Sequence, residues 1–328
     1  DMCIFDDVVK VPPGHLFRIQ LSNGEFSDSL EPIVFQDFDE LMNFGLEQRE
    51  KTSTISTEKS LSALESQLIQ VIDEQMLSDV PLGCFLSGGV DSSLIASLMQ
   101  LLHDRPIRTF SIGFEAARFN EAPYAAAVAG HLGTDHTEFI LSEQDALNVI
   151  PDLPEIYDEP FADSSQIPTV LLCREARKSV KVALTGDGGD EVFGGYNRHV
   201  TGPKLLSRMQ RVPPGLRRSA GRLVSACGPA ITEESGWLRR FASRMRLPAT
   251  ALDKLAKLAP YLGEINDIPS LYQHFSRGIY DPESLLREAV GMSPQELSFP
   301  VEGAEWMMAM DSITYLPGDI LVKVDRAA

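Results

Sequence analysis

Apolar residues recur along the chain in two patterns, one typical of helices and the other of buried strands. Between Ser60 and Leu77 they fall three or four positions apart, which predicts an amphipathic helix. Short apolar runs then alternate with helical patterns. The runs lie at 82–86, 107–114, 137–141 and 180–184. Helical patterns lie between them at 94–99, 122–132, 143–150 and 167–179. Strands that alternate with helices predict an α/β fold with a parallel, doubly wound sheet.

The rest of the chain shows less strand character. Residues 11–19 read as a tight turn that leads into a short strand, and residues 45–58 are polar and aperiodic, which predicts a linker. Residues 201–250 hold ten Lys and Arg against two acidic side chains, and the remainder up to Val324 has a mostly helical pattern. We therefore expect the α/β sheet to carry a helical C-terminal part.

Composition excludes several classes of function. The chain has 328 residues, 43% of them hydrophobic, and a net charge of −18, which argues against a general nucleic-acid binder. It has neither an apolar run of about 18 residues nor a leader pattern, so we expect no membrane partner and no signal peptide. Four widely spaced cysteines favour reduced thiols in a cytoplasmic protein. Because the chain starts at Asp1 and not at Met, we expect its N-terminus to be incomplete.

The most informative segment is PLGCFLSGGVDSSL at 81–94. An apolar strand runs into Ser87-Gly88-Gly89, and a helix is expected from near Asp91. Two glycines allow a sharp turn and a close approach to a ligand, and the N–H groups of a helix start favour a phosphate. An aspartate would repel a bare phosphate, so Mg²⁺ is expected between them. The alternative is an ordinary strand-turn-helix with Asp91 as N-cap.

A second glycine loop, TGDGGDEVFGGY at 185–196, follows the strand at 180–184. Acidic side chains among glycines suit a metal–phosphate site better than a core. In an open parallel sheet, ligands bind at the carboxyl ends of the strands. We therefore expect the two loops to converge, and the alternative is a solvated turn.

The motifs together resemble one family. The first loop lacks the G-x-x-x-x-G-K-[ST] and G-x-G-x-x-G patterns. Its SGGVDSS resembles the pyrophosphate loop of the ATP pyrophosphatases. With TFSIGF at 109–114, YDEPFADSS at 157–165 and the second loop, the chain from about residue 60 to 328 resembles the synthetase domain of glutamine-dependent asparagine synthetases. VPPGHLFRI at 11–19 resembles the last hairpin of that family's glutaminase domain.

The resemblance implies an organisation. It implies an adenine nucleotide alpha hydrolase-like fold over residues 59–328, preceded by the tail of a β-rich glutaminase-type domain at 1–44 and a linker at 45–58, with both ends incomplete. The segment at 315–327 resembles the part of the family that leads into its last helices, which supply a further lysine. Lys323 lies in this segment and is not assigned that role.

The resemblance also implies a nucleotide and metal site. Asp91 and Asp190 match the Mg²⁺-linked carboxylates. Leu86 and Ile112 match the positions whose backbone contacts adenine in the family. Thr185 and Gly186 match its second nucleotide-binding pair. The pyrophosphate loop corresponds to Ser87, Gly88, Gly89, Asp91, Ser92 and Ser93.

Two departures bear on catalysis. Asp187 stands where other members carry a longer Glu that assists formation and breakdown of the acyl-adenylate, and Gly189 stands where Ser is frequent. Asp187 and Glu191 are the candidate catalytic groups, either of which could take a proton from the incoming ammonium. Glu159, Asp163 and Ser164 are candidates for shaping the substrate side, with a solvated turn as their alternative.

The activity that the resemblance implies is ATP-dependent amidation of aspartate. The β-carboxylate would form β-aspartyl-AMP and release pyrophosphate, and ammonia would then displace AMP, with ATP and Mg²⁺ as the bound groups. In the full-length enzyme ammonia comes from glutamine through an N-terminal Cys that this chain lacks, and the resemblance is compatible with a homodimer. The alternatives are amidation or cyclisation of another carboxylate, or a non-catalytic homologue.

Overall fold

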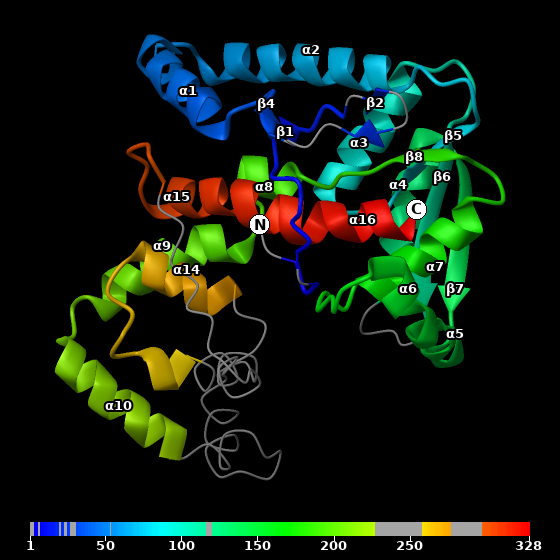
Figure 1. Cartoon of the computed structure of the whole chain (residues 1–328). Helices are drawn as coiled ribbons and strands as arrows, with labels where there is room; N and C mark the ends of the chain where they lie inside the picture. Colours follow the sequence, from blue (N-terminus) through cyan, green and yellow to red (C-terminus); the bar gives the residue numbers. More distant parts are fainter. Residues whose placement is uncertain are drawn as a thin grey trace. The chain divides into compact units, whose positions relative to one another are not determined.

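The computed structural model in Figure 1 describes residues 3–5, 7–19, 21–22, 25–26, 31–52, 54–115, 120–226, 258–276 and 297–328. The chain forms two compact units. The first contains Asp1–Asp190 together with Asp311–Ala328, and the second contains Glu191–Met310. No described helix is long and apolar enough to cross a membrane.

A parallel sheet of four strands forms the centre of the first unit. Its strands are β5 (Leu82–Phe85), β6 (Arg108–Phe114), β7 (Asp135–Leu141) and β8 (Val182–Leu184), in the order β7-β6-β5-β8. The helices between them are α3 (Val90–Leu101), α4 (Ala122–Leu132), α5 (Glu143–Val149), η2 (Ile150–Asp152), α6 (Leu153–Tyr157) and α7 (Gln166–Ala176). The predicted strands and helices are confirmed, with ends that differ by a few residues.

Both faces of this sheet are covered, as the predicted doubly wound fold requires. Alternate residues of β5 point to opposite sides. Cys84 packs in a core with Ala96 and Met99 of α3, whereas Phe85 packs in a second core with Phe110 of β6 and residues of α7. Figure 1 shows α7 on one side of the strands and α3 on the other.

The N-terminal part holds two small hairpins and two helices. Strand β1 (His15–Leu16) pairs with β4 (Ile33–Val34), and β2 (Leu21–Ser22) pairs with β3 (Glu25–Phe26), both antiparallel. Helix α2 (Thr57–Gln75) confirms the predicted amphipathic helix. Helix α1 (Phe38–Thr52) runs into the segment predicted as a linker, and the domain boundary at 45–58 stays a prediction.

Helix α1 forms without a clear apolar period because its ends are stabilised locally. Asp37 accepts a hydrogen bond from the backbone N–H of Asp39 at 2.8 Å, as an N-cap does. Its first turn carries acidic residues and its last turn carries Arg49 and Lys51, which complement the helix dipole. These signals lie at the helix ends, so a search for apolar spacing does not detect them.

The end of the chain returns to the sheet of the first unit. The π-helical segment η5 (Asp311–Ile320) continues into α16 (Leu321–Ala327), which packs against α6 and α7. Val322 and Ala327 lie on the core formed by Val149, Tyr157 and Val170. This return places residues separated by about half the chain next to each other.

The second unit is helical in its described part, as expected from the sequence. It contains α9 (Asn197–Met209), α10 (Pro214–Ala226), η3 (Ala259–Tyr261), α14 (Ile268–Ser276) and α15 (Gly303–Met310), and the short α8 (Gly189–Phe193) spans the division between the units. The buried Arg217 of α10 donates hydrogen bonds to the carbonyls of Val212, Leu262 and Ile265. The basic stretch predicted between 201 and 250 lies outside the described residues from position 227 onward.

Candidate nucleotide site

The first glycine loop connects β5 to α3. Leu86 is buried, and its N–H donates to the carbonyl of Phe110 at 2.8 Å, so β5 stays paired up to the start of the loop. Gly88 has a φ of +81°, and a Cβ built there would lie 2.6 Å from Cβ of Tyr124. Gly89 is the N-cap of α3 and makes no side-chain cap. Only glycine fits the turn at position 88. Because the N-cap residue Gly89 has no side chain, no capping group occupies the first N–H groups of the helix.

Hydroxyl groups line the same loop. Ser87 and Ser92 lie with their Oγ atoms 2.9 Å apart, and the N–H of Gly89 donates to Ser87 Oγ at 3.2 Å. Ser93 differs from Ser87 and Ser92, because its Oγ is shielded from solvent and has no hydrogen-bond partner among the residues that the structure describes. A helix start, two glycines and a spare hydroxyl together suit a phosphate ligand.

The second glycine loop follows β8. Thr185 is half-buried, and its Oγ1 accepts the N–H of Asp187 at 3.3 Å. Gly188 has a φ of +92°, which turns the chain sharply toward α8. The side chain of Asp187 is exposed.

The two loops meet, as the sequence predicts. A Cβ built on Gly186 would lie 2.7 Å from the backbone nitrogen of Ser92. One built on Gly189 would lie 2.8 Å from Cγ of Asp91. The second loop therefore lies directly against the start of α3, and its glycines provide the space for the Asp91 carboxylate.

This meeting point has a topological cause. The chain leaves β5 toward β6 on one side and later returns to β8 on the other side of β5. Strands that diverge in this way leave a crevice at their carboxyl ends, where open α/β sheets bind ligands. Both glycine loops follow those ends.

The acidic residues of the loops fit a Mg²⁺ ion that arrives with phosphates. Asp91 contacts Gly189, and Asp190 is the next residue along the chain. Mg²⁺ usually takes one or two carboxylates and completes its shell with water and substrate phosphates. Within the described ranges no group of three or more His, Cys, Asp or Glu side chains could hold a metal. Asp91 and Asp190, next to a phosphate-binding loop, provide the one or two carboxylate ligands expected for a Mg²⁺ that binds together with a nucleotide.

Two other predicted residues have different surroundings. Ile112 lies on β6 opposite Phe139 and is half-buried. Glu191 belongs to the second unit, is 1% exposed, and accepts a hydrogen bond from the Tyr196 hydroxyl at 2.6 Å. Its carboxylate is therefore already engaged, unlike the exposed one of Asp187.

The YDEPFADSS segment is held by residues remote in sequence. Glu159 accepts hydrogen bonds from the thiol of Cys3 at 3.2 Å and from Lys10 at 3.0 Å, and these bonds hold its pKa below the usual value. Asp163 forms an ion pair with Lys323 at 3.1 Å. Ser164 is exposed. The sequence did not point to Lys323 as part of this group.

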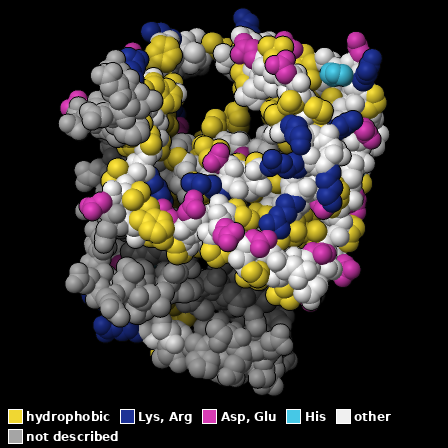
Figure 2. Space-filling model, turned by 45° about the vertical axis from the view of Figure 1, so that its right-hand side comes forward, with side chains coloured by type: hydrophobic (Ala, Val, Ile, Leu, Met, Phe, Trp, Pro, Cys, Tyr) yellow, Lys and Arg dark blue, Asp and Glu magenta, His cyan; other side chains and the backbone are white. Residues whose placement is uncertain are grey.

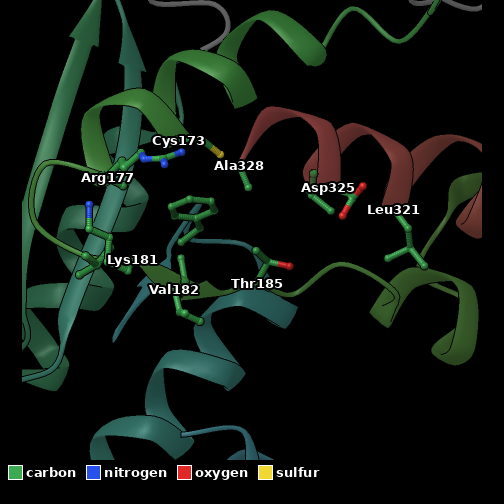
Figure 3. Close-up of a pocket in the computed structure, with 13 residues that line it drawn as sticks. Cys173, Arg177, Lys181, Val182, Thr185, Leu321, Asp325 and Ala328 are labelled. Atoms are coloured by element: carbon green, nitrogen blue, oxygen red, sulfur yellow. The ribbon is translucent and has the colours of Figure 1, made fainter. Parts of the chain in front are cut away.

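A separate pocket of about 540 Å³ lies beside β8, between α7 and α16, and Figure 3 shows its lining. Thr185 is the predicted site residue that reaches it. Arg177 and Lys181 are on one side and Asp325 of α16 is on the other. The pocket is adjacent to the second loop, and the residues of the first loop do not line it.

Charge is unevenly distributed on the surface of this acidic chain. Figure 2 shows a group of Lys and Arg side chains on one face, with Asp and Glu side chains around them. On and near α7, Arg174 pairs with Asp152 at 2.8 Å and Lys178 with Glu175 at 2.6 Å. Exposed pairs of this kind contribute little to stability.

Comparisons with known proteins agree with the geometry. A family model described as asparagine synthase matches residues 63–328. A glutamine-hydrolyzing asparagine synthetase 1 of Bacillus subtilis is 30% identical over 319 residues, which are 97% of this chain and 46% of that protein. A putative asparagine synthetase of Methanocaldococcus jannaschii is 42% identical over 157 residues, 48% of this chain and 30% of its own length. One from Mycobacterium tuberculosis is 32% identical over 267 residues, 78% of this chain and 37% of its own. The chain thus spans less than half the length of these relatives.

Proposed function

The chain belongs to the asparagine synthase family, and on that premise we propose that it carries the ATP-dependent step of asparagine synthesis. In this reaction the β-carboxylate of aspartate attacks the α-phosphorus of ATP and releases pyrophosphate. Ammonia then attacks β-aspartyl-AMP and releases AMP, and in the full-length protein the ammonia would come from glutamine. The observation that carries the proposal is the contact between the two glycine loops at the switch point of the sheet.

Each loop has a distinct part in this proposal. The start of α3 and the Ser93 hydroxyl would bind the departing pyrophosphate, while Leu86, Ile112, Thr185 and Gly186 would contact the nucleotide. Asp91 and Asp190 would hold Mg²⁺, which neutralises phosphate charge when it is bound. Catalysis would come mainly from holding carboxylate and phosphate in line and from neutralising the charge that develops.

Proton transfer would fall to an acidic side chain. An exposed Asp187 in the second loop can accept the proton that the incoming ammonium must lose. Glu191 is the second candidate, although its hydrogen bond to Tyr196 makes it less available. Asp187→Asn and Glu191→Gln, each assayed for amide formation, would show which of the two side chains accepts the proton.

The test of the proposal is ATP–pyrophosphate exchange with and without aspartate. We expect exchange that requires aspartate in the unchanged chain, and its loss in Asp91→Asn. If Asp91→Asn exchanges as fast as the unchanged chain, Asp91 has no role in binding metal and phosphate. If exchange requires a different carboxylate, that carboxylate and not aspartate is the acceptor. If no acid supports exchange, the chain is a non-catalytic homologue.

A further inference from the structure

Strand β8 forms one edge of the parallel sheet in the first unit. In the order β7-β6-β5-β8 it pairs with β5, and no other described strand lies on its outer side. Its residues Val182, Ala183 and Leu184 are apolar, yet none of them is buried and Val182 is 41% exposed. The outer side of an edge strand presents backbone N–H and C=O groups that can pair with another extended chain.

The pocket of about 540 Å³ lies along this edge, and we call it the edge pocket. Residues 181–183 line it along the strand. The end of α7 contributes Cys173 and Arg177, and α16 contributes Leu321 and Asp325, each pair one helical turn apart and so on one face of its helix. Ligand pockets typically measure about 300–1,000 Å³, so the edge pocket has the size of a binding site.

Opposite charges lie on opposite sides of the edge pocket. Figure 3 shows Arg177 and Lys181 together near the start of β8, and Asp325 of α16 on the other side, toward Thr185. In the part of the chain that the structure describes, none of the three charged side chains forms an ion pair or a side-chain hydrogen bond. The edge pocket therefore offers charges of both signs to a ligand.

These features together define the chemistry of an occupant. An unpaired strand edge selects an extended backbone, and an apolar lining that includes Phe85, Val180 and Val324 selects apolar side chains. The two cations select an acidic group at one end, and Asp325 selects a basic group at the other. A small apolar acid would match only part of this set, because it would leave the strand edge and Asp325 unpaired.

We propose that the edge pocket binds an extended segment of another polypeptide, which adds a strand to β8. The segment is apolar in its middle, with an acidic residue beside Arg177 and Lys181 and a basic residue beside Asp325. Backbone hydrogen bonds to the strand edge supply affinity, and the two charged ends set the register. This interaction goes beyond the proposed function and does not depend on it, because the peptide can bind without ATP or an acceptor.

The competing explanation is that Lys181 only protects the edge. Native proteins place lysines on exposed edge strands to prevent pairing with other chains. Protection predicts that Lys181→Gln makes the edge pair more readily with any extended peptide. The proposed interaction predicts the reverse for a peptide with an acidic end, since Lys181 then provides an attractive charge.

The experiment is calorimetric titration of the full chain with the peptide acetyl-KVTVE-amide, which in extended form spans about 17 Å, at about 3.4 Å per residue. We expect one-to-one binding with a dissociation constant below about 1 mM. The peptide acetyl-KVTVQ-amide lacks the acidic end and should bind several-fold more weakly. The same KVTVE peptide with N-methyl groups on its three central residues cannot pair as a strand, and it should bind about tenfold or more weakly.

Variants of the chain test the assigned groups. Lys181→Gln should weaken binding of the KVTVE peptide several-fold and leave binding of the KVTVQ peptide unchanged. Lys178→Gln is the matched control, because Lys178 pairs with Glu175 and does not line the edge pocket, so it should change neither. Val324→Phe should fill the edge pocket and abolish binding of both peptides without lowering the melting temperature.

Four results overturn the inference. The first is no binding of the KVTVE peptide, and the second is equal binding of its N-methylated form, which would make the edge pocket a site for apolar acids. Tighter binding of the KVTVE peptide to Lys181→Gln would show edge protection instead. Self-association of the chain, measured by sedimentation and abolished in Val324→Phe, would show that a second copy of the chain occupies the edge pocket.

Discussion

The carboxylate of Asp91 lies against the α-carbon of Gly189, so closely that a Cβ at that position would be 2.8 Å from Cγ of Asp91. Asp91 lies in the first turn of α3, and Gly189 is the first residue of α8 within the second loop. The two residues are remote in sequence and belong to different motifs. Their contact makes the position of the acidic group in one loop depend on the absence of a side chain in the other.

Gly189→Ala should move the Asp91 carboxylate and impair use of ATP. The new methyl group would meet the end of a side chain, which can turn away at small cost in stability. We expect ATP–pyrophosphate exchange to fall about tenfold or more, the effect of losing roughly 1.4 kcal/mol of interaction, with little change in melting temperature.

Two other glycines serve as controls for this prediction. Gly186→Ala would place a Cβ 2.7 Å from the backbone nitrogen of Ser92, so it should cost about 1–3 kcal/mol of stability. Gly130→Ala, in α4 with open space around it, should be neutral or stabilising by about 0.5–1 kcal/mol. Thermal unfolding with exchange activity measures all three variants, and normal exchange in Gly189→Ala would contradict the importance of the contact.

Ser92 and Ser93 should respond differently to alanine. Ser92 makes hydrogen bonds within the loop, so Ser92→Ala should destabilise the chain by about 1 kcal/mol. Ser93 Oγ has no described partner, so Ser93→Ala should leave stability unchanged or slightly higher while it weakens nucleotide binding. Denaturant unfolding and nucleotide titration distinguish them. Loss of stability in Ser93→Ala would mean that its hydroxyl has a structural partner.

Lys323 and Arg326 lie on the same helix and both form ion pairs, but they should differ in their contribution to stability. Removal of the buried Lys323 leaves two carboxyl groups without a cation, so Lys323→Ala should cost about 3–5 kcal/mol. The Arg326 pair is exposed, and Arg326→Ala should cost at most about 1 kcal/mol. Urea unfolding of the two variants measures this contrast. Equal losses would show that the pair of Lys323 and Asp163 is solvated like the surface pair.

The stability of the chain should depend on pH through Asp319. Its pKa rises from an ordinary 3.8 to about 6 on folding, so the folded state favours the protonated form. Its favourable contribution is complete below about pH 4 and is lost as the pH rises through 6. Asp319→Asn should therefore gain about 1–2 kcal/mol relative to the unchanged chain between pH 4 and 8, since each pKa unit corresponds to about 1.4 kcal/mol and part of it is screened by solvent.

The measurement is urea unfolding of both proteins at several pH values. Asp163 and Lys323 face Asp319, so the difference between the two proteins reports the titration of Asp319 together with its electrostatic coupling to these two groups. A difference that stays constant from pH 4 to 8 would contradict the raised pKa.

Local sequence determined the elements and the motifs. The apolar runs at 82–86 and 107–114 sit between helical patterns, and that order specifies a parallel sheet because a crossover helix must join parallel strands. The glycines of both loops were also evident, since a strand that runs into Gly-Gly before a helix has few structural alternatives. The family resemblance rested on the same strings and is confirmed by the match over 63–328.

The tertiary structure decided which of these residues meet. The strand order β7-β6-β5-β8 brings Gly189 onto Asp91, and the return of the chain through α16 brings Lys323 onto Asp163. No local pattern encodes either contact, because each depends on the packing of segments far apart in the chain. The burial that raises the pKa of Asp319 likewise exists only after these helices have packed together. Sequence thus determined the chemical groups of the site, and the fold determined their neighbours and their charge.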